Sequence, residues 1–209
     1  MPNGVEFSVT QQAEALLDRF RAGDAAALGD LFTLYRDRLW RMLYVRLDRR
    51  LRARVSPDDV LQETFLEVSR RIGEYLSDQA VPIYVWLRFL TVQRMQMIQR
   101  VHLGADMRTV DREVSTIGPP ASADSMAGQL VSDLTSPSQA AIRRELQEQL
   151  RTALDEMDPL DREVLALRHF EELDNGEVAN ILGISKDAAS KRHVRALKRL
   201  KTVLGIARN

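Results

Sequence analysis

Residues 174–185 read DNGEVANILGIS, and this stretch decides the fold of the last third of the chain. Polar residues open it and can cap a short helix whose apolar side includes Val178 and Ile181. Gly183 follows where a residue in the left-handed conformation ends a helix. Ser185 is a good cap for a second helix. A short helix, a glycine turn and a capped second helix together predict a helix-turn-helix.

The second helix carries its basic residues on one side. Residues 186–201 hold seven basic residues and one acidic residue, whereas the whole chain balances 30 against 30. At 100° per residue Ala189 and Leu200 share a buried face, and Lys191 and Arg195 point away from it. Such a face suits the phosphates and base edges of a DNA major groove, whereas a solvated basic hairpin would leave the turn unexplained. The predicted duplex-DNA contacts are Ser185, Lys186, Ala188, Lys191, Arg192, Arg195, Lys198 and Arg199.

The rest of the chain also has helical periodicity, and no alternating strand pattern or hairpin turn is evident. His193 lies on the inward face of the second helix, so we expect it to pack or to hydrogen-bond a neighbouring helix. The predicted fold class is all-α, with two small helical domains joined by a flexible linker, the C-terminal one a four-helix helix-turn-helix domain. The predicted limits are 8–103, a Gly-, Pro- and Ser-rich linker 104–139, and 140–205.

Composition excludes several classes of protein. The chain has no cysteine, so disulfides and thiolate metal sites are excluded. Its three histidines are far apart in sequence, and we predict no metal and no cofactor. No apolar run approaches the ~20 residues of a membrane helix, and no signal-peptide pattern opens the chain. We therefore expect a cytoplasmic protein without a membrane partner.

A second strong helix start lies at residues 56–59, which read SPDD. The helix that follows has an apolar inner stripe and an outer face on which Leu66 stands among acids and amides. Such a leucine is often plain surface, but it also suits a partner helix that brings basic residues around an apolar spot. Glu63 and Glu67 share this face, yet a di-metal enzyme site needs more carboxylates and histidines than this half supplies. We therefore predict no catalytic site.

A polar loop and an amphipathic helix follow between residues 77 and 103. Aromatic residues beside arginines and amides can stack on and hydrogen-bond unpaired bases. Trp86 and Leu90 fit the core better than a nucleic-acid surface. The predicted contacts with single-stranded DNA are Ser77, Asp78, Gln79, Arg88, Gln93, Arg94, Gln96 and Arg100.

Three segments together resemble the small, two-domain extracytoplasmic-function (ECF) group of bacterial sigma factors in the sigma-70 family. Residues 20–39 resemble the opening helices of the first domain. Residues 56–68, SPDDVLQETFLEV, resemble the segment that binds core polymerase. Residues 157–200 resemble the domain that reads the −35 promoter element.

This resemblance implies a transcription initiation factor without catalytic residues. Core RNA polymerase would bind the helix after Pro57, the C-terminal domain would bind the −35 duplex, and the 77–100 region would melt the −10 element. The linker would thread toward the polymerase active site, and an anti-sigma factor is a further candidate partner. The implied polymerase-binding residues are Asp59, Gln62, Glu63, Leu66, Glu67 and Arg70.

Two other functions stay open at this point. A sigma mimic would sequester an anti-sigma factor without starting transcription, but such mimics typically carry a receiver domain and a degraded DNA-reading helix. A simple helix-turn-helix repressor or activator would bind duplex DNA tightly without polymerase. That alternative leaves the segment 59–65, DVLQETF, unexplained.

Overall fold

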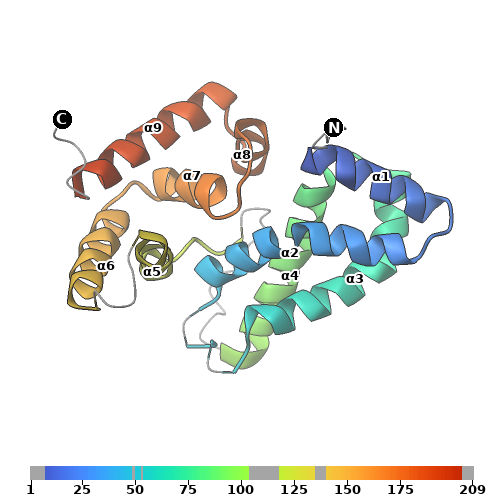
Figure 1. Ribbon diagram of the computed structural model, residues 1–209, viewed down its shortest axis with the longest axis horizontal. Helices are drawn as coiled ribbons and strands as arrows, with labels where there is room; N and C mark the ends of the chain where they lie inside the picture. The colour runs from blue at the N-terminus through green and yellow to red at the C-terminus, as the bar shows by residue number, and fades with distance from the viewer. Residues whose placement is uncertain (1–7, 49, 53, 104–117, 135–139, 204–209) are drawn as a thin grey trace, which may run out of the picture.

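The structure is a computed structural model that describes residues 8–48, 50–52, 54–103, 118–134 and 140–203. These described residues are all-helical, as predicted, and contain no strand. Figure 1 shows α1 to α4 on one side and α5 to α9 on the other. The helices are α1 (Val9–Arg21), α2 (Ala26–Arg46), α3 (Pro57–Ser77), α4 (Ile83–Leu103), α5 (Ala123–Leu134), α6 (Ala140–Asp155), α7 (Pro159–His169), α8 (Asn175–Leu182) and α9 (Lys186–Val203).

The start of α3 is fixed by a capping box. The Ser56 hydroxyl accepts a hydrogen bond from the Asp59 amide at 3.2 Å, and the Asp59 carboxylate accepts one from the Ser56 amide at 2.8 Å. Pro57 occupies the first turn, where its missing N–H is not needed. The predicted helix start is therefore confirmed, and it sets which residues of α3 face outward.

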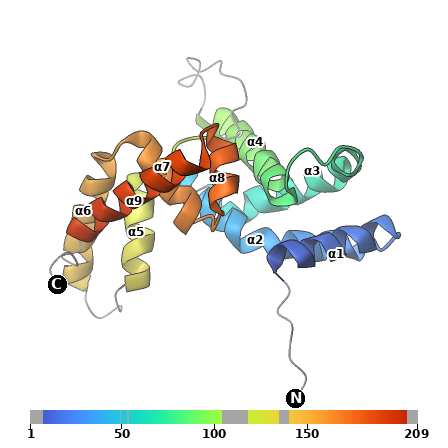
Figure 2. The ribbon, with the colours of Figure 1, turned by 90° about the horizontal axis from the view of Figure 1, so that it is seen from above.

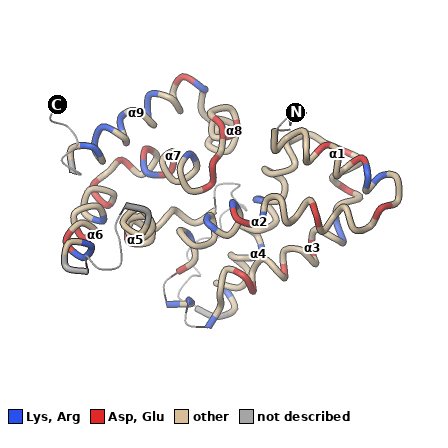
Figure 3. Tube along the Cα trace, in the orientation of Figure 1, with Lys and Arg blue, Asp and Glu red and all other residues tan. Residues whose placement is uncertain are grey.

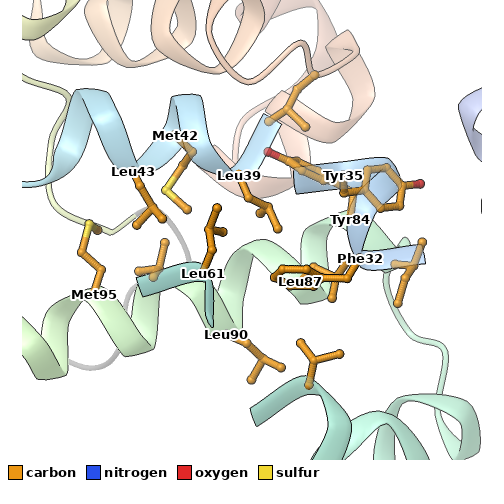
Figure 4. Close-up of a cluster of buried hydrophobic side chains, with 14 of the residues drawn as sticks. Phe32, Tyr35, Leu39, Met42, Leu43, Leu61, Tyr84, Leu87, Leu90 and Met95 are labelled. Carbon is orange, nitrogen blue, oxygen red and sulfur yellow. The ribbon is translucent and has the colours of Figure 1, made fainter. Parts of the chain in front are cut away.

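The core of the N-terminal half lies where α2, α3 and α4 cross. Figure 4 shows Leu39, Met42 and Leu43 of α2 facing side chains of α3 and α4. Leu39, Leu43, Leu87 and Met95 have no exposed surface, and Leu90 is 1% exposed. Burial of each such side chain contributes about 1.5–3 kcal/mol, so this crossing holds α3 and α4 in register.

The segment predicted as a linker is partly helical. Its described part, residues 118–134, contains α5, whose Met126, Ala127 and Val131 are buried against α6 and the end of α2. The Ser122 amide donates a hydrogen bond to the Val45 carbonyl of α2 at 2.7 Å. Residues 104–117 and 135–139 lie outside the described residues. A linker role for 104–139 stays a prediction.

The helix-turn-helix has the predicted local geometry. Asp174 and Glu177 form a capping box at the start of α8. Gly183 ends α8 with φ 63°, in the left-handed region. The Ser185 hydroxyl accepts a hydrogen bond from the Ala188 amide at 3.1 Å and caps α9. Ala189 and Ala196 of α9 are fully or almost fully buried, so the inward face is the predicted one.

The two halves are packed against each other. Figures 1 and 2 both place α7 and α8 beside the crossing of α2 and α4. One cluster of buried side chains continues from Tyr35 and Leu87 in the first half to Leu167 and Val178 in the second. The first half therefore shares part of its core with α7 and α8.

Replacing Gly183 with alanine tests the turn between α8 and α9. A Cβ in the left-handed region costs about 1 kcal/mol, and this substitution should lower the free energy of unfolding by about that amount. The matched control is Gly29→Ala inside α2, where an added Cβ meets nothing within 4 Å and should stabilise by about 0.5–1 kcal/mol. Urea titration followed by circular dichroism measures both; equal shifts of the same sign would contradict the turn geometry.

Candidate nucleic-acid and partner interfaces

The outward face of α9 holds the predicted duplex-DNA contacts. Ser185, Lys186, Lys191, Arg195 and Lys198 are exposed. Figure 3 shows Lys and Arg at intervals along α9. The structure therefore brings the predicted residues to one accessible helix, and their contact with DNA stays a prediction.

Several arginines of α9 pair with acidic residues in α7 and in the turn between α6 and α7. Arg195 donates from Nη2 to Asp161 at 2.7 Å, and Arg192 donates from Nη1 to the same carboxylate at 2.7 Å. Arg199 donates to Glu156 at 2.6 Å. Hydrogen bonds from Arg195 and Arg192 lower the pKa of Asp161, although its burial opposes this shift. These contacts orient three predicted DNA-binding arginines, and the wide sequence separation hid them from sequence analysis.

His193 hydrogen-bonds a neighbouring helix, which confirms its predicted role. Its Nε2 lies 2.9 Å from Nε2 of His169 at the end of α7, so one imidazole donates to the other. Burial lowers the pKa of both histidines, and the charge of Arg168 lowers each further. The contact therefore requires at least one neutral ring.

The outer face of α3 presents the predicted polymerase-binding residues together. Leu66 is 54% exposed. Gln62, Glu63 and Arg70 are exposed around it, and Glu67 is half-buried. Asp59 also serves the capping box, and its hydrogen bonds from Ser56 lower its pKa. The result is one apolar side chain inside a mostly acidic ring on a rigid helix.

Arg94 of α4 connects this face to the predicted single-stranded DNA surface. Its guanidinium lies 3.6 Å from a carboxylate oxygen of Glu63 and 3.4 Å from one of Glu67. Gln93, Gln96 and Arg100 line a shallow pocket beside it. The two predicted surfaces are therefore neighbours, which the sequence did not indicate.

The loop after α3 borders a cleft of about 580 Å³. Ser77, Asp78 and Gln79 are exposed at the end of α3 and in this loop. The cleft combines charged and amide groups, which can hydrogen-bond base edges, with tyrosine rings that are almost fully buried. Its lining includes Tyr35, Arg38, Tyr75, Gln79, Tyr84 and Glu177.

Arg88 differs from the other predicted DNA contacts because it is 1% exposed. Its Nε donates to the Glu171 carboxylate at 2.6 Å, across the boundary between the two halves. DNA contact by Arg88 remains a prediction that requires the halves to separate. Sequence analysis did not identify Arg38, Arg41 and Arg46 of α2, which bind the same region of the C-terminal half.

Comparisons with known proteins agree with this arrangement. Residues 147–200 match the family described as "Sigma-70, region 4". The ECF RNA polymerase sigma factor BldN of Streptomyces coelicolor is 28% identical over 90% of this chain, and the match spans 64% of that protein. CarQ of Myxococcus xanthus is 29% identical over 90% of this chain and 95% of its own length.

Two further proteins extend the comparison. The RNA polymerase sigma-H factor of Pseudomonas aeruginosa is 24% identical over 93% of this chain and 94% of its own length. The fold is similar to that of CnrH, solved in complex with the cytosolic domain of CnrY, with a TM-score of 0.53 and 20% identity. That match covers 94% of this chain and 99% of CnrH.

The fold is all-helical in the described residues and similar to that of a solved protein of similar length, and the sequence comparisons point to sigma factors. Over about nine-tenths of its length the chain is similar to RNA polymerase sigma factors, one of them named as an ECF sigma factor, and residues 147–200 match region 4 of the sigma-70 family. Within the described residues no group of three or more His, Asp or Glu side chains is arranged to hold a metal ion. No described helix is both long and apolar enough to span a bilayer.

The histidine pair predicts a pH-dependent stability of the C-terminal half. Because the folded-state pKa of each histidine is lowered, the unfolded chain binds more protons as the pH falls through about 6.5. Stability should therefore fall between pH 7.5 and 5.5 and level off below the lowered pKa values. Melting temperatures across this range measure the effect. A His169→Gln, His193→Gln variant with an equally steep dependence would refute its assignment to this pair.

Proposed function

We propose that the chain docks on core RNA polymerase through the outer face of α3 and reads a promoter at two places. The observation that carries this proposal is the exposed Leu66 inside its ring of acids and amides. An exposed leucine beside carboxylates suits a partner helix with an apolar patch flanked by basic residues. A coiled coil of the largest polymerase subunit is the proposed partner.

We assign the −35 duplex to α9. A helix whose inner face is buried and whose outer face carries Lys and Arg can enter the major groove. Lys186 and Lys198 are exposed near opposite ends of this helix and suit phosphates. Ala188, half-buried close to the helix start, is small enough to let the backbone approach a base pair.

The −10 element is assigned to the loop after α3 and to the outer face of α4. Melting needs no chemistry, because capture of unpaired bases shifts the equilibrium toward the open strand. The polar and charged groups of the cleft beside Gln79 support contacts with base edges, and Gln93, Gln96 and Arg100 support contacts along the strand. Threading of the segment 104–139 toward the polymerase active site, and an anti-sigma factor as a further partner, belong to the same proposal.

Binding to core polymerase tests the α3 assignment. A Glu63→Arg, Leu66→Arg variant replaces the central leucine and one acid with like charges, so affinity for bacterial core RNA polymerase should fall at least about tenfold. Co-elution and fluorescence titration of the labelled full chain measure the loss. Val9→Arg, Asp37→Arg makes similar exchanges on α1 and α2, where both side chains are exposed, and should bind normally.

The outcome separates the remaining functions. A folded wild-type chain that fails to bind core polymerase would overturn the polymerase proposal. Tight sequence-specific binding to duplex DNA without polymerase would then favour a repressor or activator. No binding to duplex DNA would favour a sigma mimic.

Salt dependence tests the assignment of α9. The association constant for DNA falls as the salt concentration rises, with a steepness set by the number of phosphates neutralised. If Lys186 and Lys198 each neutralise one phosphate, a Lys186→Ala, Lys198→Ala variant should make the plot of the logarithm of this constant against log salt concentration less steep by about 2. Binding of holoenzyme to a promoter fragment between 50 and 200 mM salt, followed by fluorescence anisotropy, measures the slope. Arg143→Ala, Arg144→Ala removes the same charge from α6. An equal change in that control would show that α9 is not the contact.

A further inference from the structure

Four arginines of the N-terminal half surround one acidic loop of the C-terminal half. We call Arg38, Arg41 and Arg46 of α2 and Arg88 of α4 the arginine socket, and residues 170–173, between α7 and α8, the acidic loop. Both carboxylate oxygens of Glu171 are bound: Arg88 Nε donates to Oε2 at 2.6 Å, and Arg46 Nη2 donates to Oε1 at 2.7 Å. The side chains of Arg46 and Glu171 are completely buried.

The socket also binds the backbone of the acidic loop. Arg38 Nε donates to the Glu171 carbonyl at 2.8 Å, and Arg41 Nε donates to the Phe170 carbonyl at 2.9 Å. Arg41 also reaches the Glu172 carboxylate at 2.6 Å. Glu172 has φ 53°, the left-handed region that a non-glycine residue adopts only when its surroundings hold it there. The loop is therefore shaped to its arginine partners.

The charges in this contact depend on one another. Burial alone would raise the pKa of Glu171, but Arg88 and Arg46 outweigh it and the pKa is lowered. Burial would likewise lower the pKa of Arg46, and Glu163 and Glu171 raise it instead. A buried ion pair adds little net stability, whereas loss of one partner leaves an uncompensated charge. When the halves separate, these charges therefore have to be hydrated or paired with another ion.

The arrangement in which the acidic loop occupies the arginine socket, called the closed state below, covers groups that the proposed function needs. Arg88 is a predicted −10 contact, and it is buried under Glu171. Arg38 lines the cleft beside Gln79, and Glu177 of α8 lies 3.7 Å from Arg38 at the same cleft. When the acidic loop moves away, the four guanidiniums lose the carboxylate and carbonyl oxygens that this loop supplies. A nucleic-acid phosphate supplies the same kind of oxygen acceptor and can replace them.

We propose that the arginine socket is a masked phosphate-binding site of the N-terminal half, which the acidic loop occupies in the free chain and promoter DNA occupies after the two halves separate. This inference rests on the proposed function, because it names a regulation of the same DNA-binding surface. Its ligand is the sugar–phosphate backbone of single-stranded DNA.

A Glu171→Gln variant tests the closed state. The chain has no cysteine, so Ser69→Cys in α3 and Gln149→Cys in α6 provide two specific sites for a pair of fluorescent dyes. Energy transfer in the free chain should fall with Glu171→Gln. It should stay unchanged with Glu148→Gln, which removes an equal charge from an exposed pair with Arg151 on α6. Unchanged energy transfer in folded Glu171→Gln would overturn the closed state.

Binding of a 12-nucleotide single strand tests the phosphate site. Glu171→Gln should bind this oligonucleotide at least about tenfold more tightly than the wild type, and Glu148→Gln should bind it within about twofold. Adding Arg46→Gln to Glu171→Gln should remove the gain while the chain stays open. An open Glu171→Gln chain without tighter binding would overturn the phosphate site.

A reversible cross-link covers the case in which Glu171→Gln does not fold. Arg41 and Glu172 face each other across the boundary, so cysteines at these two positions can be joined by a bis-maleimide with a cleavable disulfide. Because Arg41 belongs to the socket, the reference is the same cysteine variant before joining. The joined chain should lose the single-strand binding and promoter opening that this unjoined variant retains, and a reductant should restore that level. A joined chain as active as the unjoined variant would overturn the inference. A wild type that never binds polymerase would instead overturn the proposed function, because the dye measurement needs no polymerase.

Discussion

The buried ion cluster around Glu171 is the interaction on which the arrangement of the two halves depends. Two arginines from different helices of the first half, Arg46 and Arg88, share this carboxylate, and Arg46 also reaches Glu163 of α7. The Pro119 carbonyl accepts from Arg46 at 2.8 Å, which ties the chain entering α5 to the same cluster. Since these charges are removed from water, loss of one member leaves the cluster with a buried charge that is not fully compensated.

Local signals in the sequence were sufficient for the starts of α3, α8 and α9 and for the outward faces of α3 and α9. The capping boxes at Ser56 and Asp174 and the glycine turn at Gly183 each involve residues within four positions of one another. Their geometry follows from hydrogen bonds between side chains and nearby backbone amides and from the conformation of one glycine, all of which are local in sequence. The exposure of Leu66 follows in the same way, because the cap fixes the helix and the apolar stripe fixes its rotation.

Long-range pairing was what the sequence did not reveal. Arg88 was predicted as a DNA contact because it accompanies aromatic and amide residues, yet its partner Glu171 lies 83 residues away. The arginines of α9 likewise pair with residues distant in sequence, Asp161 on α7 and Glu156 in the turn before it. The helix α5 was missed because its Ala- and Ser-rich sequence resembles a linker, and packing of Met126 and Val131 stabilises it.

Charged groups at a boundary that must open have an advantage over apolar ones. An apolar interface of the same size would expose its side chains to water on separation, and that exposure opposes opening and favours aggregation. Arginines in the same place become hydrated on separation and can bind a phosphate in place of the carboxylate. The left-handed Glu172 adds to this effect, because strain in the acidic loop is relieved when the loop leaves the socket. A boundary built from Arg46, Arg88 and Glu171 can therefore be tight in the free chain and still open when DNA provides a replacement for the carboxylate.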